Sequence, residues 1–275
     1  MTSATAGWRV RVAAEARHQA VLLARDPGPM IGYLVMGLLL MIATRPLYLA
    51  LAASHIGQTG PGVDQAAAGM AVMFSLFALK IAGAHLLNER TWHTWDRLRA
   101  TPASFGEILI GKTLPIYAAI LAQQLLLFAF AAVIFGLHPR AGWWTLAICI
   151  AAWSACILLM GAGAATLART PAQLSAAGDI FALLTSVLGG AIVPISLLPH
   201  AMRSLAPISP GYWGLRAYHA ALTATPTSLV HPLIALAGFG VLGAGIATLI
   251  GAAQSGRPSN AGLRHQGAAS TSDHQ

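Results

Sequence analysis

The chain has 275 residues, of which 56% are hydrophobic and only 9% are charged. A soluble domain carries about a quarter charged residues, so this composition excludes an ordinary soluble protein and indicates one embedded in a lipid bilayer. The net charge is +8, from 16 Lys and Arg against 8 Asp and Glu. We attribute this excess to membrane orientation rather than to nucleic-acid binding.

The N-terminal segment, residues 1–28, lacks the apolar core of a cleavable signal peptide, so we expect the first membrane helix to direct insertion. Its stretch from Trp8 to Arg25 is basic and mildly amphipathic. This pattern predicts a helix along the inner membrane surface, with its cations near anionic lipid. The alternative is a plain solvated lead-in to the first membrane helix.

Six apolar runs are long enough to cross a bilayer as helices, which takes about 20 residues each. They cover residues 30–53, 66–87, 109–135, 143–167, 174–198 and 229–252. We therefore predict an all-α integral membrane protein with a six-span domain over residues 29–252. Arg45-Pro46 interrupts the first run, so that helix is expected to end early or to kink there.

Lys and Arg are distributed unevenly between the two sides of these runs. Eleven flank the side that holds both termini, and three, Arg140, Arg203 and Arg216, flank the other. Cytoplasmic connections carry the excess of Lys and Arg, so both termini are predicted to be cytoplasmic. Arg45 and Lys80 lie inside runs and are expected to extend toward opposite membrane faces.

The connection between the second and third runs reads NERTWHTWDRLRATPASFGEILIGK, residues 88–112. Its first part has helical length and ends before Pro102. Trp92, Trp95 and Leu98 are spaced by three residues and share one face, with charged residues around the rest. This pattern predicts a short helix that docks on a cytoplasmic partner, and the alternative is an ordinary solvated loop.

The stretch FGEILIGKT contains G-x-x-x-x-G-K-[ST], the pattern of a phosphate-binding P-loop. A P-loop requires a glycine-rich turn between a strand and a helix. The central residues from Glu107 to Ile110 have no turn chemistry, and no strand–helix alternation surrounds them. We interpret the match as coincidental. Lys112 is instead expected to reach the cytoplasmic head groups, and Gly111 to allow close helix approach.

The same connection resembles the cytoplasmic loop of ABC-2 type transporter permeases, especially the daunorubicin-resistance type of drug-export permease. The family pattern E-R-E-x-G-T-x-E-x-L-x-x-T-P is followed by a Leu/Gly-Lys element. The matching residues are Glu89, Arg90, Thr94, Leu98, Thr101, Pro102, Gly111 and Lys112. His93 replaces the usual Gly, and Asp96 stands where an acidic residue is common. The resemblance covers about residues 15–252.

This resemblance implies a permease subunit that works with a separate ATPase. Two permease chains and two ATPase chains would form the exporter, and ATP and Mg²⁺ would bind the ATPase, so no cofactor is expected in this chain. The loop would be a coupling helix seated in the ATPase. Its expected coupling residues are Glu89, Arg90, Trp92, Thr94, Trp95, Asp96, Arg97, Leu98 and Arg99.

Three further features lie outside that loop. The segment from Pro194 to Pro226 is too broken by prolines for a span, and predicts short helices packed at the outer mouth, with re-entrant backbone surrounded by protein. Residues 253–275 are rich in small and polar residues and predict a disordered cytoplasmic tail. Cys149 and Cys156 are interpreted as buried free thiols.

Polar residues inside the spans are the remaining candidates. Asp179 lies well inside the fifth run, where a buried charge is expensive. We favour a structural pair with Arg169, or a contact with the N-terminal segment, over a proton or substrate-cation site. The same holds for Lys80 and His85. The histidine spacings match no metalloprotease motif, and no G-x-S-x-G is present, so neither a metal nor a catalytic site is expected.

The function expected from residues and resemblance together is export of an amphipathic small molecule, such as a drug or antibiotic, across a bacterial plasma membrane. Three alternatives remain open: a proton-driven secondary carrier using Asp179, an ABC exporter of a lipid or lipid-linked glycan, and a membrane scaffold or enzyme. Paired broken helices, common in secondary carriers, are not evident in the sequence.

Overall fold

The structure, a computed structural model, describes residues 2–53, 62–91, 105–223 and 229–255, and every regular element in these residues is a helix. Their order along the chain is α1 (Thr2–Arg25), α2 (Gly28–Ala53), α3 (Gly62–Thr91), α5 (Phe105–Phe135), α6 (Trp143–Leu167), α7 (Pro171–Leu188), η1 (Ile195–Leu197), α8 (His200–Leu205), η2 (Ala206–Ile208), α9 (Pro210–Thr223) and α10 (Val230–Ser255). The predicted all-α class is confirmed.

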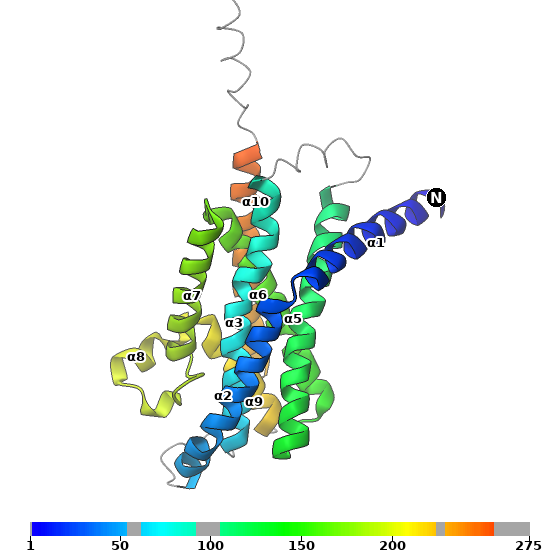
Figure 1. Cartoon of the computed structure of the whole chain (residues 1–275). Helices are drawn as coiled ribbons and strands as arrows, with labels where there is room; N and C mark the ends of the chain where they lie inside the picture. The colour runs from blue at the N-terminus through cyan, green and yellow to red at the C-terminus, as the bar shows by residue number, and fades with distance from the viewer. Residues whose placement is uncertain (1, 54–61, 92–104, 224–228, 256–275) are drawn as a thin grey trace, which may run out of the picture.

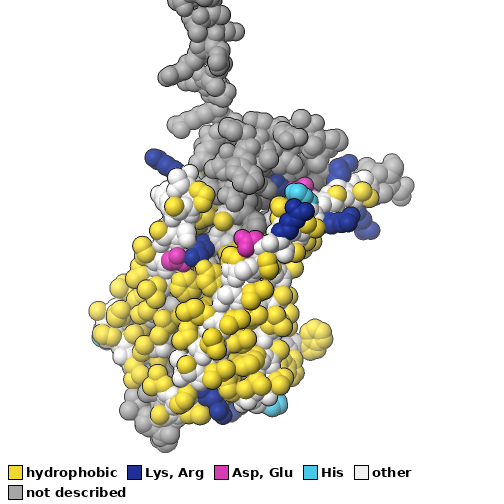
Figure 2. Space-filling model, viewed as in Figure 1, with side chains coloured by type: hydrophobic (Ala, Val, Ile, Leu, Met, Phe, Trp, Pro, Cys, Tyr) yellow, Lys and Arg dark blue, Asp and Glu magenta, His cyan; other side chains and the backbone are white. Residues whose placement is uncertain are grey.

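Within the described residues, six helices are long and apolar enough to cross a membrane: α2, α3, α5, α6, α7 and α10. They lie side by side as a bundle, with α1 leaning away from one end (Figure 1). Hydrophobic side chains form a broad band on the face shown in Figure 2. Trp143 and Trp144 are exposed at the end of the bundle opposite α1, as expected of an interfacial aromatic belt.

The predicted end of the fifth span is wrong. We expected it to run to Leu198, but α7 ends at Leu188. Gly189 caps the helix, and Gly190 follows with a φ of +82°, a left-handed conformation that turns the chain away from the helix axis. The short η1 helix starts after Pro194. The prediction was wrong because the sequence stays apolar beyond Leu188, whereas the backbone geometry ends the helix there.

The first span differs in a smaller way. The helix α2 continues through Pro46 to Ala53 rather than ending at Arg45, although its membrane-compatible window ends at Leu47. The Arg45 guanidinium lies 5.1 Å from the centre of the Phe135 ring on α5. This cation–π contact places the charge at the far ends of both spans.

The helix α3 is the central element of the bundle. It packs against α2, α5, α6, α7 and α9. Of its membrane-compatible window 83% is buried, against 11% for α2. Small residues make this possible, since Ala67, Ala71, Ala78 and Ala82 are fully buried. Neighbouring backbones can then approach α3 closely on several sides.

Glycines allow close packing at the α3–α6–α10 contacts. A Cβ added at Gly161 on α6 would lie 2.7 Å from the carbonyl oxygen of Leu79, and one at Gly163 would lie 2.8 Å from that of Gly243 on α10. A Cβ at Gly243 would lie 2.6 Å from the oxygen of Leu159. By contrast, Gly245 faces open space.

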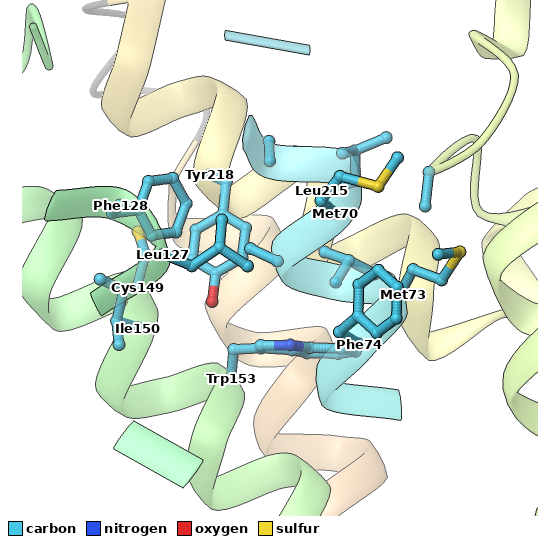
Figure 3. Packing of buried hydrophobic residues seen from close by; sticks show 14 of the residues in the cluster. Met70, Met73, Phe74, Leu127, Phe128, Cys149, Ile150, Trp153, Leu215 and Tyr218 are labelled. Carbon is cyan, nitrogen blue, oxygen red and sulfur yellow. The ribbon is translucent and has the colours of Figure 1, made fainter. Parts of the chain in front are cut away.

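The proline-rich segment after α7 forms the short helices η1, α8, η2 and α9, as predicted. The longest, α9, is largely buried and packs against α3, α6, α7 and α10. Trp153 of α6 lies directly against it, because a Cβ at Gly214 would be 2.8 Å from the indole ring. Figure 3 shows Trp153 and Tyr218 facing the same interior from α6 and α9. The segment is thus part of the core.

The helix α1 is held against the start of α5. A Cβ at Gly111 would lie 2.7 Å from Cβ of Glu15, so the predicted close helix approach at Gly111 is confirmed. The expected orientation of Lys112 is wrong, however. Its side chain is only 7% exposed, and its Nζ lies 3.6 Å from Oε1 of Glu15. A carboxylate on α1 binds the cation that we expected among lipid head groups.

The P-loop-like motif lies entirely within α5, which begins at Phe105. The residues from Gly106 to Thr113 are therefore helical, and the motif lacks the loop that a phosphate site of this type requires. The interpretation of this match as coincidental agrees with the structure.

The paired glycines on α10 test the packing argument. Gly243→Ala is expected to lower the free energy of unfolding by about 1–3 kcal/mol, since the added methyl group meets backbone that must shift. Gly245→Ala, two residues away, is the matched control and is expected to be neutral or stabilising by up to about 1 kcal/mol through helix propensity. Thermal unfolding of the purified protein in detergent measures both. Equal melting temperatures would contradict the close contact.

The Glu15–Lys112 pair makes a second prediction. Lys112→Met leaves the largely buried Glu15 carboxylate without this partner, at a cost on the order of 3 kcal/mol, and is expected to lower the melting temperature in detergent. The reversed double variant, Glu15→Lys with Lys112→Glu, is expected to recover part of the loss. Arg17→Met, an exposed change on α1, is the control. A reversed variant no more stable than the single one would show that the pair does not stabilise the contact.

Candidate functional site

The expected coupling residues lie at and beyond the end of α3. Glu89 and Arg90 belong to the last turns of that helix, but the structure does not describe their side chains. Trp92, Thr94, Trp95, Asp96, Arg97, Leu98 and Arg99 lie outside the described residues. The flanking helix ends, Thr91 of α3 and Phe105 of α5, lie at the end of the bundle from which α1 extends (Figure 1).

The membrane-embedded polar candidates are brought together in part. Lys80 of α3 donates a hydrogen bond to Oδ1 of Asp179 on α7, with 2.5 Å between Nζ and the oxygen. Asp179 therefore has a partner, as we favoured, but the expected partner Arg169 was wrong. Lys80 lies on the neighbouring helix α3. The Lys80–Asp179 contact could not be predicted from spacing because the two residues are 99 positions apart in the sequence. The side chain of His85 is not described.

Aromatic rings surround the cationic end of this pair. The Lys80 ammonium lies 5.6 Å from the centre of the Tyr33 ring on α2. Tyr33 in turn stacks on Phe77 of α3, with 5.8 Å between ring centroids. Gly178 lies beside Lys80 and leaves room for its aliphatic stem, since a Cβ there would be 3.1 Å from Cβ of Lys80. Three helices thus contribute to one polar cluster.

The cluster lies in the half of the bundle nearer the end from which α1 extends. Tyr33 is five residues from the start of its span at Gly28, and Lys80 is four from the end of its span at Ala84. At 1.5 Å per residue, both lie about 6–8 Å inside the bundle end from which α1 extends, and Asp179, eight residues from Pro171, lies about 12 Å inside. Tyr33 and Lys80 thus lie closer to this end than to the midplane of a hydrocarbon core about 30 Å thick. The backbone of Asp179 lies near the middle of its 18-residue span, and its carboxylate reaches Lys80.

A second set of polar contacts crosses the core and was missed from the sequence. The Trp153 indole donates to Oγ of Ser75 at 2.6 Å, Gln124 donates to the backbone oxygen of Ala71, and Gln65 donates to that of Gly190. The sequence feature that could have predicted these contacts was the presence of amide and hydroxyl side chains within apolar runs. Their bonds join α3 to α5, α6 and the turn after α7, and satisfy polar groups that would otherwise be buried alone.

Two buried polar residues of α9 have no such partner. Among the described residues, the Tyr218 hydroxyl and Nε2 of His219 make no hydrogen bond. Burial, and to a smaller extent the nearby Arg216 guanidinium, lowers the pKa of His219 to about 4. His219 is therefore neutral at physiological pH, and protonating it would place an unpaired charge in the core.

Metal and thiol chemistry have little basis in the described residues. Within them, no three His, Cys, Asp or Glu side chains are grouped as a metal site. Cys149 and Cys156 are buried free thiols, and the Cys149 thiol donates to the backbone oxygen of Ala217. This confirms their interpretation as small buried residues.

Comparisons with known proteins agree with this architecture. Residues 14–223 match the model of the ABC-2 type transporter family. The chain is also 29% identical, over 152 residues, to the linearmycin resistance permease protein LnrN of Bacillus subtilis (strain 168), an alignment that covers 54% of this chain and 38% of that relative. The six membrane-compatible helices and the family match lead to one conclusion. The chain belongs to the ABC-2 type transporter family, whose members are membrane subunits of transporters rather than enzymes.

Proposed function

We propose that this chain is the membrane subunit of an ATP-driven exporter that moves an amphipathic small molecule out of the cell. A separate ABC ATPase would bind and hydrolyse ATP, and two permease chains would pair with two ATPase chains. The observation that carries the proposal is the family match over residues 14–223, which includes the connection between α3 and α5. The relative named for resistance to linearmycin supports a small-molecule cargo.

The proposed coupling would act through the two helix ends that flank that connection. Closure of an ATPase pair would push on residues 92–104, and the force would enter the bundle through the ends of α3 and α5. Because α3 packs against five other helices, a displacement at its end would reach all of them. The Glu15–Lys112 pair would make α1 move with α5.

We also propose that α1 lies along the inner surface of a bacterial plasma membrane. Its exposed side chains include apolar ones, Trp8, Val10, Val21 and Leu22, together with cations such as Arg9 and Arg17. Apolar residues among cations suit the boundary between anionic head groups and acyl chains. Both termini would then be cytoplasmic.

Lipid or lipid-linked glycan export is the nearest alternative, because the exposed surface of the spans is apolar and suits several hydrophobic cargoes. A proton-driven carrier using Asp179 finds less support, since its carboxylate forms an ion pair with Lys80.

The ATPase partnership is tested by purifying the tagged chain from its native cells in mild detergent and identifying co-purifying proteins by mass spectrometry. We expect a stoichiometric ABC ATPase. Its recovery should fall at least about tenfold for the double variant Glu89→Ala, Arg97→Ala, if loss of interface anchors costs 1.4 kcal/mol or more. Arg140→Ala, an exposed change between α5 and α6 at the opposite end, is the control. Absence of an ATPase from intact, monodisperse complexes would reject the exporter and favour the proton-driven carrier.

The proposed orientation is tested by labelling single introduced cysteines with a membrane-impermeant maleimide. Background labelling should be low, because Cys149 and Cys156 are buried. We expect His138→Cys, exposed between α5 and α6, to react in intact cells. Arg17→Cys on α1 should react only after the membrane is permeabilised. The reverse pattern would place the termini outside the cytoplasm.

A further inference from the structure

We propose that Asp179, Lys80 and Tyr33 form a lateral binding site for the positively charged head of an amphipathic cargo that enters from the inner leaflet. This inference rests on the proposed function, because it treats the ligand as cargo of an exporter. The site lies where α2 and α7 both pack against α3. Figure 2 shows charged side chains of both signs within the otherwise hydrophobic face of the bundle.

The charge of the site is set by which end of the ion pair is exposed. The Asp179 side chain is 44% exposed, whereas that of Lys80 is 18% exposed. The Lys80 ammonium contacts Oδ1 of Asp179 and lies over the Tyr33 ring. The Oδ2 atom of Asp179 has no partner among the described residues. An incoming molecule therefore meets a carboxylate first, which favours a cation over an anion.

The aromatic residues favour the same kind of ligand. Tyr33 and Phe77 are both partly buried and stack on each other beside Lys80. The faces of such rings carry partial negative charge and attract organic cations. A carboxylate beside aromatic rings is a combination that binds ammonium-type groups without requiring that they lose all their hydration.

The apolar body of the ligand also has a place. Leu183 lies one helical turn beyond Asp179, and Met36 lies nearly one turn beyond Tyr33, and these side chains are 51% and 56% exposed. Both are further from the bundle end from which α1 extends. A molecule with its cation at Asp179 would thus extend its apolar part toward the membrane interior, the orientation that an amphipath adopts in a leaflet.

Membrane energetics require something polar at this site. A charged side chain exposed to hydrocarbon is costly, and such residues in spans mark substrate pathways or paired sites. The pair with Lys80 reduces this cost, but the half-exposed carboxylate still needs a polar neighbour at its outer side. Because Lys80 and Tyr33 lie near the ends of their spans, the charged head of an amphipath in that leaflet is the fitting neighbour, and we assign that head to cargo rather than to a resident lipid.

The test compares two probes of the same shape and opposite charge, tetraphenylphosphonium and tetraphenylborate. Binding of each radiolabelled probe is measured on the full-length protein in nanodiscs of phosphatidylglycerol and phosphatidylcholine, with protein-free discs subtracted. We expect saturable binding of the cation only. Asp179→Asn should weaken it about tenfold or more, since it removes a charge in a region of low dielectric. Asp26→Asn, an exposed carboxylate outside the spans, should leave it unchanged.

Two further variants separate the site from general folding. Lys80→Met keeps the carboxylate and removes its competitor, so cation binding should tighten. Tyr33→Leu keeps the ion pair and should weaken cation binding about threefold, as expected for loss of one cation–π contact. If Asp179→Asn does not yield monodisperse protein, Tyr33→Leu decides: unchanged affinity in that variant overturns the proposal.

Other outcomes also overturn it. Equal binding by Asp179→Asn and Asp26→Asn would remove the carboxylate from the site, and binding of tetraphenylborate that depends on Lys80 would make the ligand anionic. Replacing phosphatidylcholine by phosphatidylethanolamine distinguishes cargo from lipid: unchanged cation affinity supports cargo, whereas weaker affinity assigns the site to an ammonium head group of lipid. These assays need no ATPase, so their failure is distinct from failure to recover one by co-purification.

Discussion

The burial of α3 is the constraint on which the bundle depends. A transmembrane helix gains little from leaving lipid for protein, because both surroundings are apolar, so close packing and polar contacts must hold it. The fully buried alanines of α3 and the facing glycine at Gly161 allow the close packing. Ser75 and Gln65 supply the polar contacts, each to a different element. Each of the other membrane-compatible helices packs against this one or α6.

The polar groups of the bundle separate into two sets by position. Those in the core, such as Trp153 and Gln124, bond to serine or to backbone carbonyls and are almost fully buried. The ion pairs Lys80–Asp179 and Glu15–Lys112 lie nearer the end from which α1 extends, and each joins two helices. Hydrogen bonds between uncharged groups thus join the helices in the core of the bundle, while ion pairs join them nearer the end from which α1 extends.

The fold could be predicted largely because hydropathy acts locally: each spanning run contains within itself the apolar length that lipid requires. The errors arose where structure depends on distant partners or on backbone geometry. Ending α7 required the turn at Gly190 rather than a change in composition. The partners of Asp179 and Lys112 lie on other helices, and neither spacing nor charge could identify Lys80 or Glu15 among several candidates. The coupling residues remain predictions, since their side chains are not described.

The contact between α1 and α5 has a consequence for the order of assembly. The ribosome makes Glu15 before α2 and α3, whereas its cation Lys112 follows both. Until α5 enters the bilayer, α1 has no docking surface and no ion-pair partner at Gly111 and Lys112. The helix α1 therefore cannot dock while α2 and α3 are inserted, and its contact with α5 forms only once that third span is in place. The earliest segment of the chain is thus fixed in place by a contact that forms only after two spans have followed it.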